Sequence, residues 1–153
     1  MNRLNLKIPP PLLVLVFGLL MWLLSLFLPG VDIPVKIRTV VALIIVGTGL
    51  AFTIPGILAF KTKGTTVNPL SPEKASCLVQ DGIYGVTRNP MYVGLFIYLV
   101  AWAIFLSNLY TLPLVICFIF YMNKFQIELE EKALLSLFGE EFVSYKNSVR
   151  RWL

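Results

Sequence analysis

Apolar residues gather in four long runs, and most polar residues fall between them. The runs cover residues 12–28, 39–60, 91–106 and 109–122. A helix needs about 20 residues to cross the apolar part of a bilayer, so the first two runs predict membrane-spanning helices. Only Ser107 and Asn108 separate the last two, shorter runs. They predict a tight helical hairpin whose ends continue past the apolar core.

The first two helices carry almost no polar chemistry. Residues 27–30 offer no small-residue cleavage site, which favours a mature anchor over a removable signal. Within the second run, Gly47, Gly49 and Gly56 allow close approach of a neighbouring helix, and Pro55 predicts a kink. We therefore interpret these two helices as a scaffold.

Composition supports a membrane location. The 153 residues are 58% hydrophobic and 14% charged, whereas soluble domains carry about 25% charged residues. Too little polar surface is available to cover a water-soluble globule. We predict an all-α integral membrane protein with four transmembrane helices.

The positive charges predict how the chain is oriented. Of thirteen lysines and arginines, only Lys36 and Arg38 follow the first helix directly, and the other eleven fall on the opposite side. The positive-inside rule then predicts that both termini face the cytoplasm, in a bacterial or archaeal inner membrane or in the endoplasmic reticulum. The net charge of +5 is explained by topology and lipid contact, so no nucleic-acid partner is expected.

The lack of histidine and the spacing of the two cysteines exclude several kinds of catalytic and metal site. The chain contains no histidine, which excludes histidine-based general catalysis, the Ser-His-Asp triad and most zinc sites. Cys77 and Cys117 lie in different segments without metal-ligand spacing. No metal site is expected.

The start of the third helix predicts an anion site. The polar segment 61–88 is too long for a simple turn, and loops of this length in compact domains are usually functional or disordered. Asn89 is a preferred N-cap residue, and Pro90 is favoured at the first helical position. The helix would present its N–H groups and partial positive charge beside Arg88.

The fourth helix is expected to continue beyond the bilayer. Its helical periodicity extends to Gly139, where we expect the helix to end, because glycine commonly ends helices. Gln126 and Glu130 share one face of this extension, and Glu131 follows directly. After a second short helix, the chain ends in residues typical of a lipid interface, namely Arg150, Arg151 and Trp152.

The two polar clusters together suit one ligand. Arg88 and the helix start could take a carboxylate or a phosphate, while Glu130 and Glu131 could take hydroxyls or an ammonium group. Tyr84 and Tyr92 could offer aromatic surface to a cation. S-adenosylmethionine carries all of these groups, and the chain has no Gly-x-Gly-x-x-Gly segment for a Rossmann-type cofactor site.

Three segments closely resemble the isoprenylcysteine carboxyl methyltransferase family. They are 78–84 (LVQDGIY), 88–94 (RNPMYVG) and 130–145, which begins EEKALLSLFG. The resemblance covers roughly the C-terminal half and extends to the related phospholipid N-methyltransferases. The first two segments form one motif and the third forms another, and these two motifs, in the right order with a helical hairpin between them, make the resemblance specific.

The resemblance implies roles for individual residues. Contacts to S-adenosylmethionine are expected from Ser76, Cys77, Leu78, Val79, Tyr84, Arg88, Asn89, Pro90, Met91, Tyr92 and Glu130. Catalytic roles are expected for Arg88, Glu130 and Glu131. Asn89 replaces the family's usual histidine. Gln126, the expected substrate contact, replaces the arginine of members that act on a prenylcysteine carboxylate, and an amide cannot pair with a carboxylate as a guanidinium does.

We expect one membrane domain over residues 1–153. Residues 1–60 form the scaffold, and residues 61–153 form the catalytic half. The cytoplasmic C-terminal extension of this half is expected to form the cofactor pocket. The expected function is methyl transfer from S-adenosylmethionine to a lipophilic or lipid-modified acceptor, with membrane lipid as the surroundings. Alternatives are a phospholipid or amine N-methyltransferase, an oxidoreductase similar to NADPH-dependent sterol reductases, and a non-enzymatic scaffold. The methyl acceptor, the methylated atom and the oligomeric state stay open.

Overall fold

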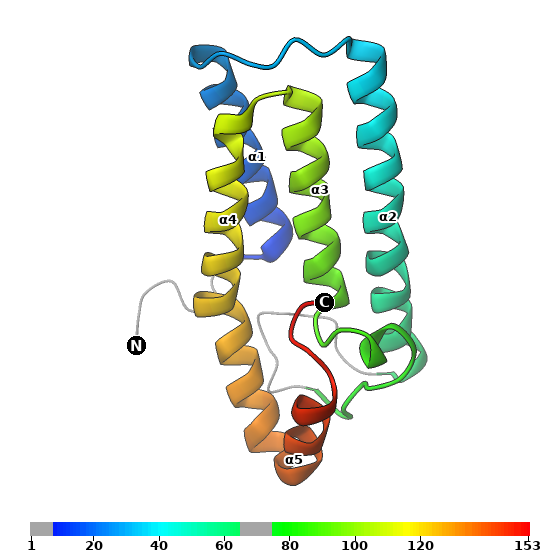
Figure 1. The fold of residues 1–153 in the computed structure, drawn as a ribbon. Helices are drawn as coiled ribbons and strands as arrows, with labels where there is room; N and C mark the ends of the chain where they lie inside the picture. Colours follow the sequence, from blue (N-terminus) through cyan, green and yellow to red (C-terminus); the bar gives the residue numbers. More distant parts are fainter. Residues whose placement is uncertain (1–7, 65–74) are drawn as a thin grey trace.

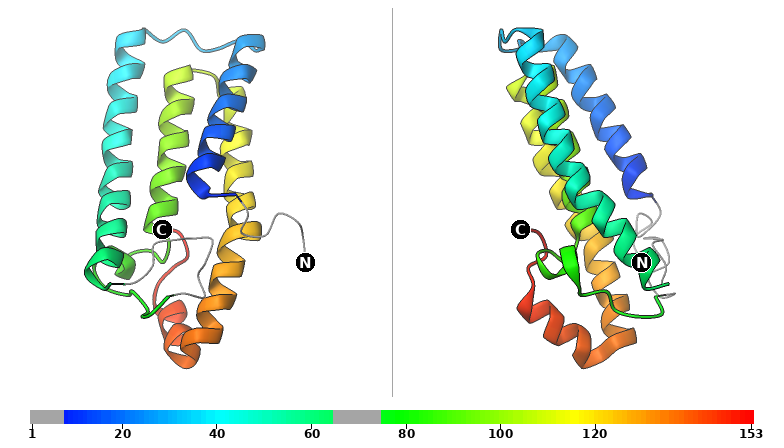
Figure 2. Two further views of the ribbon diagram at one scale, coloured as in Figure 1. Left: turned by 180° about the vertical axis from the view of Figure 1, so that it is seen from behind. Right: turned by 90° about the vertical axis from the view of Figure 1, so that its right-hand side faces the viewer.

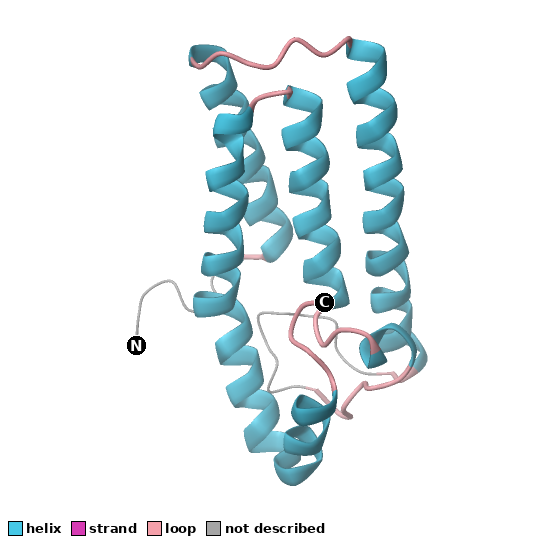
Figure 3. Ribbon diagram, in the orientation of Figure 1, coloured by secondary structure: helices cyan, strands magenta, loops and turns pink. Residues whose placement is uncertain are grey.

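The structure, a computed structural model, describes residues 8–64 and 75–153. Over these ranges the chain forms helices and loops, without a strand (Figure 3). The elements in chain order are α1 (Pro10–Phe27), α2 (Val35–Thr62), η2 (Gly82–Gly85), α3 (Pro90–Leu106), η3 (Leu109–Thr111), α4 (Leu112–Tyr121), η4 (Met122–Ile127) and α5 (Glu128–Ser148). The predicted all-α class is confirmed.

Helix α3 stands at the centre of the bundle. It contacts α1, α2 and α4, and the views of Figures 1 and 2 show these four helices running alongside one another. Helix α5 continues α4 beyond the bundle and then folds back, so the C-terminus lies near the beginning of α3 (Figure 1). This return brings the last part of the chain to the polar loops.

Small residues let α2 approach α3 closely. A Cβ atom at Gly49 would lie 2.5 Å from Cε1 of Tyr98, and one at Gly56 would lie 3.0 Å from Cγ of Met91. The prediction of close packing is thus confirmed at these two glycines. It is wrong at Gly47, where an added Cβ meets no other atom within 4 Å.

The link between α3 and α4 is a tight turn, as predicted, and we call residues 107–111 the closing turn. Ser107 adopts a left-handed conformation with φ 53°. Its carbonyl oxygen accepts from the Val31 amide at 2.6 Å, and its hydroxyl donates to the Val31 carbonyl at 2.6 Å. Asn108 Nδ2 donates to the Leu28 carbonyl at 2.9 Å. The closing turn therefore holds the link between α1 and α2.

Three helices in the described part of the chain are long and apolar enough to cross a membrane. They are Pro10–Phe27, Val35–Thr62 and the apolar part of Leu109–Ser148, and α3 is a shorter apolar helix. Many large apolar side chains on α1 and α2 are exposed, as expected for helices that face lipid. Arg3, Lys7 and Lys74, which entered the topology prediction, lie outside the described residues.

The last long helix changes character along its length. The π-helical η4 joins the apolar α4 to α5, whose 21 residues include five glutamates. Because of this charge, we place α5 outside the apolar span. At Gly139 the backbone leaves helical geometry (φ 50°, ψ −124°), a conformation that glycine adopts without steric cost. The predicted helix end at Gly139 is thus confirmed as a break, after which the chain folds back.

Candidate functional site

A pocket lies where α2 ends, α3 begins and α5 folds back. It holds about 660 Å³ of space, its open mouth included. Its walls are mostly apolar and aromatic, with a few polar side chains from α3, α5 and the loop before α3.

Tyr84 forms one wall of the pocket. Its ring packs edge-on against Phe60 with 5.3 Å between ring centroids, and the Tyr145 hydroxyl donates to its backbone carbonyl at 2.7 Å. The segment enters this position through Gly82, which has a positive φ of 61°. Burial raises the pKa of the Tyr84 hydroxyl above its ordinary value, so the group stays neutral.

Glu130 lies in a buried hydrogen-bonded group. One of its carboxylate oxygens accepts from the Tyr92 hydroxyl and, at 2.5 Å, from Gln126 Nε2. Burial raises the pKa of Glu130 to about 7, although both hydrogen bonds favour the ionised form. The predicted shared face of Gln126 and Glu130 is therefore confirmed.

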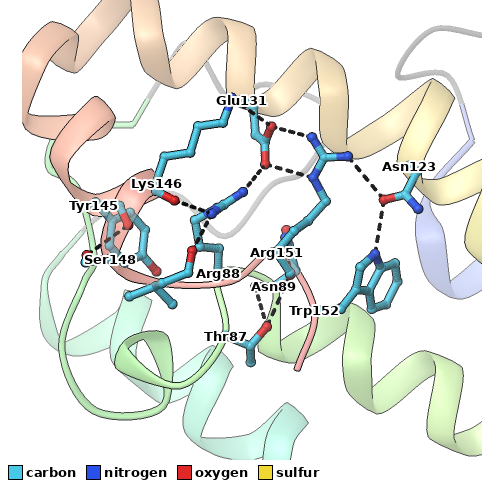
Figure 4. A network of polar contacts seen from close by, with 11 residues as sticks. Thr87, Arg88, Asn89, Asn123, Glu131, Tyr145, Lys146, Ser148, Arg151 and Trp152 are labelled. Carbon is cyan, nitrogen blue, oxygen red and sulfur yellow. Dashed lines mark hydrogen bonds and ion pairs between the residues drawn. The ribbon is translucent and has the colours of Figure 1, made fainter.

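Glu131 points to a different set of partners, shown in Figure 4. Its Oε1 accepts from Arg88 Nη2 at 2.8 Å and from Arg151 Nε at 3.0 Å, and its Oε2 accepts from Arg151 Nη2 at 2.6 Å. Burial alone would raise its pKa, but the hydrogen bonds and charges of Arg151 and Arg88 outweigh burial and lower the pKa of Glu131. Glu131 is thus an ionised acid between two guanidinium groups.

Most donors of Arg88 bind protein atoms. Nη1 donates to the carbonyl oxygens of Lys146 and Val149, and Nη2 donates to Glu131. Its Nε is buried and has no hydrogen-bond partner among the described residues. Arg88 was predicted to bind an anion. Because α5 and the chain end occupy Nη1 and Nη2, only its Nε is left for a ligand among the guanidinium nitrogens.

Asn89 occupies the predicted N-cap position of α3, but its side chain does not cap the helix. Its Nδ2 donates instead to the Arg151 carbonyl at 2.9 Å, and its backbone amide donates to Thr87 Oγ1 at 3.2 Å. The expected capping is wrong because the returning chain end competes for the same side chain.

The structure brings most of the predicted site residues to one pocket. Those that line it are Cys77, Leu78, Val79, Tyr84, Arg88, Asn89, Met91, Tyr92, Glu130 and Glu131. Ser76 and Pro90 are not among the lining residues. Gln126 is buried behind Glu130 and does not line the pocket either.

Several residues that line the pocket were not predicted from the sequence. They are Phe60, Ala75, Leu134, Phe142 and Tyr145. Leu134 is four residues after Glu130, so helical spacing could have placed it on the same face. Tyr145 lies beyond Gly139, and the fold-back at that residue brings its side chain to the pocket.

The last residues, which were expected to suit the lipid interface, have polar partners within the protein (Figure 4). Arg151 binds Glu131, and Trp152 Nε1 donates to Asn123 Oδ1 at 3.0 Å. These two side chains are therefore held by η4 and α5.

Known proteins similar to this chain point to one family. The profile described as phospholipid methyltransferase matches residues 37–141, more than half of the chain. This range includes the start of α3 and the glutamate pair.

Individual relatives agree with that match. An uncharacterized protein of Haemophilus influenzae is 48% identical over 63 residues, covering 41% of this chain and 100% of its own length. The protein-S-isoprenylcysteine O-methyltransferase of Saccharomyces cerevisiae is 40% identical over 80 residues, covering 50% of this chain and 32% of its own. The corresponding enzyme of Tribolium castaneum is 35% identical over 94 residues, with shares of 60% and 34%. The chain spans about a third of the length of these two named methyltransferases.

Proposed function

The chain belongs to the phospholipid methyltransferase family, and we propose that it transfers a methyl group from S-adenosylmethionine to a lipophilic acceptor. The observation that carries the proposal is the pocket itself. Residues predicted to contact the cofactor from three separated segments line one cavity. That convergence is what a site for one extended ligand requires.

The pocket offers suitable partners for each part of the cofactor. Glu130 is the proposed partner of the ammonium group, and the aromatic rings of Tyr84 and Tyr92 are proposed to face the sulfonium region. The buried Nε of Arg88 and the start of α3 are proposed to take the carboxylate. Leu78 and Val79 supply apolar wall for the adenine.

The protein's main task in such a reaction is alignment. The sulfonium already activates the methyl group, so the acceptor atom, the methyl carbon and the leaving sulfur have to be held in line. Positioning of this kind can supply roughly 7–11 kcal/mol in favourable cases. A carboxylate acceptor needs no base, whereas an amine acceptor must arrive neutral or lose a proton.

The acceptor is proposed to be a lipid-modified carboxylate. The named relatives are O-methyltransferases of protein S-isoprenylcysteine, and an ionised carboxylate suits a pocket that contains no histidine base. Gln126 donates to Glu130 from behind, so we propose that it acts indirectly, by holding Glu130 in place in the pocket. Phospholipid N-methylation is the alternative that the experiment has to separate.

The proposed membrane arrangement follows from the helices. We propose four crossings by α1, α2, α3 and α4, with both termini and the pocket on the cytoplasmic side. The water-soluble cofactor then enters from the cytoplasm, and the lipophilic acceptor arrives sideways from the bilayer.

Calorimetric titration of the detergent-purified protein tests cofactor binding. S-adenosylmethionine is expected to bind at one site, and NADPH is expected not to bind. Glu130→Gln should weaken S-adenosylmethionine at least tenfold. Glu128→Gln is the matched control, because Glu128 lies two residues away and pairs with Lys124 on the surface. Binding of NADPH alone, or no difference between the two variants, contradicts the proposal.

The acceptor is tested with cofactor labelled in its methyl group. Label is expected on a farnesylcysteine derivative with a free carboxylate and not on phosphatidylethanolamine. Label on the amine lipid alone would assign the N-methyltransferase alternative.

A further inference from the structure

The end of the chain is bound to the loop that precedes α3, and we call residues 149–153 the C-terminal strap. Three consecutive carbonyl oxygens of the strap accept hydrogen bonds from three consecutive loop residues. Arg88 donates to the carbonyls of Val149 and Arg150, whereas Thr87 and Asn89 both donate to the carbonyl of Arg151. These bonds hold the strap against the loop.

Within the strap, Arg151 makes the contacts that reach farthest into the site. Its carbonyl accepts from Thr87 Oγ1 at 3.2 Å and from Asn89 Nδ2 at 2.9 Å. Its guanidinium holds both carboxylate oxygens of Glu131, through Nε at 3.0 Å and Nη2 at 2.6 Å. A two-point bond of this kind fixes orientation as well as distance.

The outer side of Arg151 is anchored as well. Its Nη1 lies 3.4 Å from Asn123 Oδ1, which also accepts from Trp152 Nε1 at 3.0 Å. The Trp152 ring packs edge-on against Phe96 of α3. The strap thus links η4, α3 and α5 at the pocket, as Figure 4 shows for the polar groups.

Arg151 itself does not line the pocket, whereas Arg88, Asn89 and Glu131 do. Each of these three is held by Arg151 or shares a partner with it. Arg88 and Arg151 approach the same oxygen of Glu131. Any effect of Arg151 on a ligand must therefore pass through these residues.

We propose that Arg151 is a positioning residue of the cofactor site, which fixes Glu131 through its guanidinium and the loop carrying Arg88 and Asn89 through its carbonyl oxygen. This inference rests on the proposed function, because it assigns the strap to the same pocket. It extends the site to a segment that the sequence motifs do not include.

The test compares three variants of the full chain by calorimetric titration with S-adenosylmethionine. Arg151→Gln removes the two-point bond and is expected to weaken binding at least tenfold. Arg150→Gln removes the same charge from an exposed side chain of the same strap and should stay within twofold of the parent. Arg151→Lys keeps the charge without the planar fork and should restore part of the affinity.

The titration also separates positioning from folding. A purely structural role reduces the number of binding sites per chain and leaves the Kd of the folded fraction unchanged. Positioning raises the Kd while the number of sites stays near one. A Kd for Arg151→Gln within twofold of Arg150→Gln overturns the inference, and if Arg151→Gln fails to fold, Arg151→Lys is judged by the same criterion.

The two proposals fail in different ways. If the parent protein does not bind S-adenosylmethionine, the proposed function is wrong and this inference falls with it. If the parent binds normally and Arg151→Gln does too, only the role of Arg151 is wrong.

Discussion

Two polar clusters lie at opposite ends of α3, and they use their polar groups differently. In the closing turn, the neutral side chains of Ser107, Asn108 and Thr111 are buried and donate to backbone carbonyls. At the other end, Arg88 and Glu131 belong to a charged network beside the pocket. The closing turn therefore joins helices, whereas the second cluster combines support with groups that can meet a ligand.

The space beside each cluster strengthens this comparison. A pocket also adjoins the closing turn, but its polar lining consists of Ser107 and Asn108, whose side chains are already bonded to the backbone. The pocket at the start of α3 is lined by Arg88, Glu130 and Glu131. A cavity at a helix end thus becomes a candidate site through its ionisable lining, not through its size.

The largest effect is expected from Glu131→Gln, which would break the charged cluster. It leaves the guanidiniums of Arg88 and Arg151 facing each other across a neutral amide. Losing one partner of a buried ion pair costs about 3 kcal/mol or more, so thermal unfolding in detergent should show a clear drop in Tm. The affinity for S-adenosylmethionine should fall as well.

The matched control for that change is Glu140→Gln, on the exposed part of α5. It removes the same charge without touching the cluster and should change stability by less than about 0.5 kcal/mol. Equal losses in the two variants would mean that net charge, and not the placement of Glu131, matters.

A smaller effect is expected from pH, and it concerns Glu130. Because its pKa is raised from 4.5 to about 7, the folded state keeps this proton at pH values where the unfolded state has lost it. The contribution of Glu130 to stability is therefore complete below about pH 4.5 and is lost as pH rises toward 7. The Tm of the ligand-free protein should fall between pH 5 and 7.5.

Glu130→Gln identifies the source of that pH dependence, because the amide does not titrate. The fall in Tm should be smaller in this variant than in the parent. Tyr92, Gln126 and Glu131 face Glu130, and the lowered pKa of Glu131 places its own titration below this window. An unchanged slope in Glu130→Gln would rule out Glu130 as the responsible group.

Sequence patterns predicted the closing turn more fully than the pocket. Long apolar runs interrupted only by Ser107 and Asn108 determine a helical hairpin, since local periodicity fixes both helices. The break at Gly139 was likewise predictable from a residue that tolerates a positive φ. These features depend on neighbours in the chain.

The pocket depends on contacts between distant segments, and there the prediction was incomplete. The family resemblance named Arg88 and Glu131, but it did not indicate that they bind each other. Nor could local patterns show that Arg151 returns to bind Glu131, because that contact forms only after α5 folds back at Gly139. Arginine and tryptophan at the end of the chain are typical of a lipid interface. In the structure their polar groups bind Glu131 and Asn123, which distant parts of the chain supply.

The smallest effect, and the one that separates the clusters most sharply, is expected from Asn108→Ala. The change removes the bond to the Leu28 carbonyl and the acceptor for the Tyr110 amide at 3.0 Å, which should cost about 1–2 kcal/mol. The 17 residues of α3 put the closing turn roughly 25 Å from the pocket at 1.5 Å per residue. Affinity for S-adenosylmethionine should therefore stay within twofold while Tm falls, and Asn147→Ala, at an exposed position of α5, should change neither. If Asn108→Ala weakens binding as strongly as Glu131→Gln, the two ends of α3 are coupled and the closing turn is part of the site.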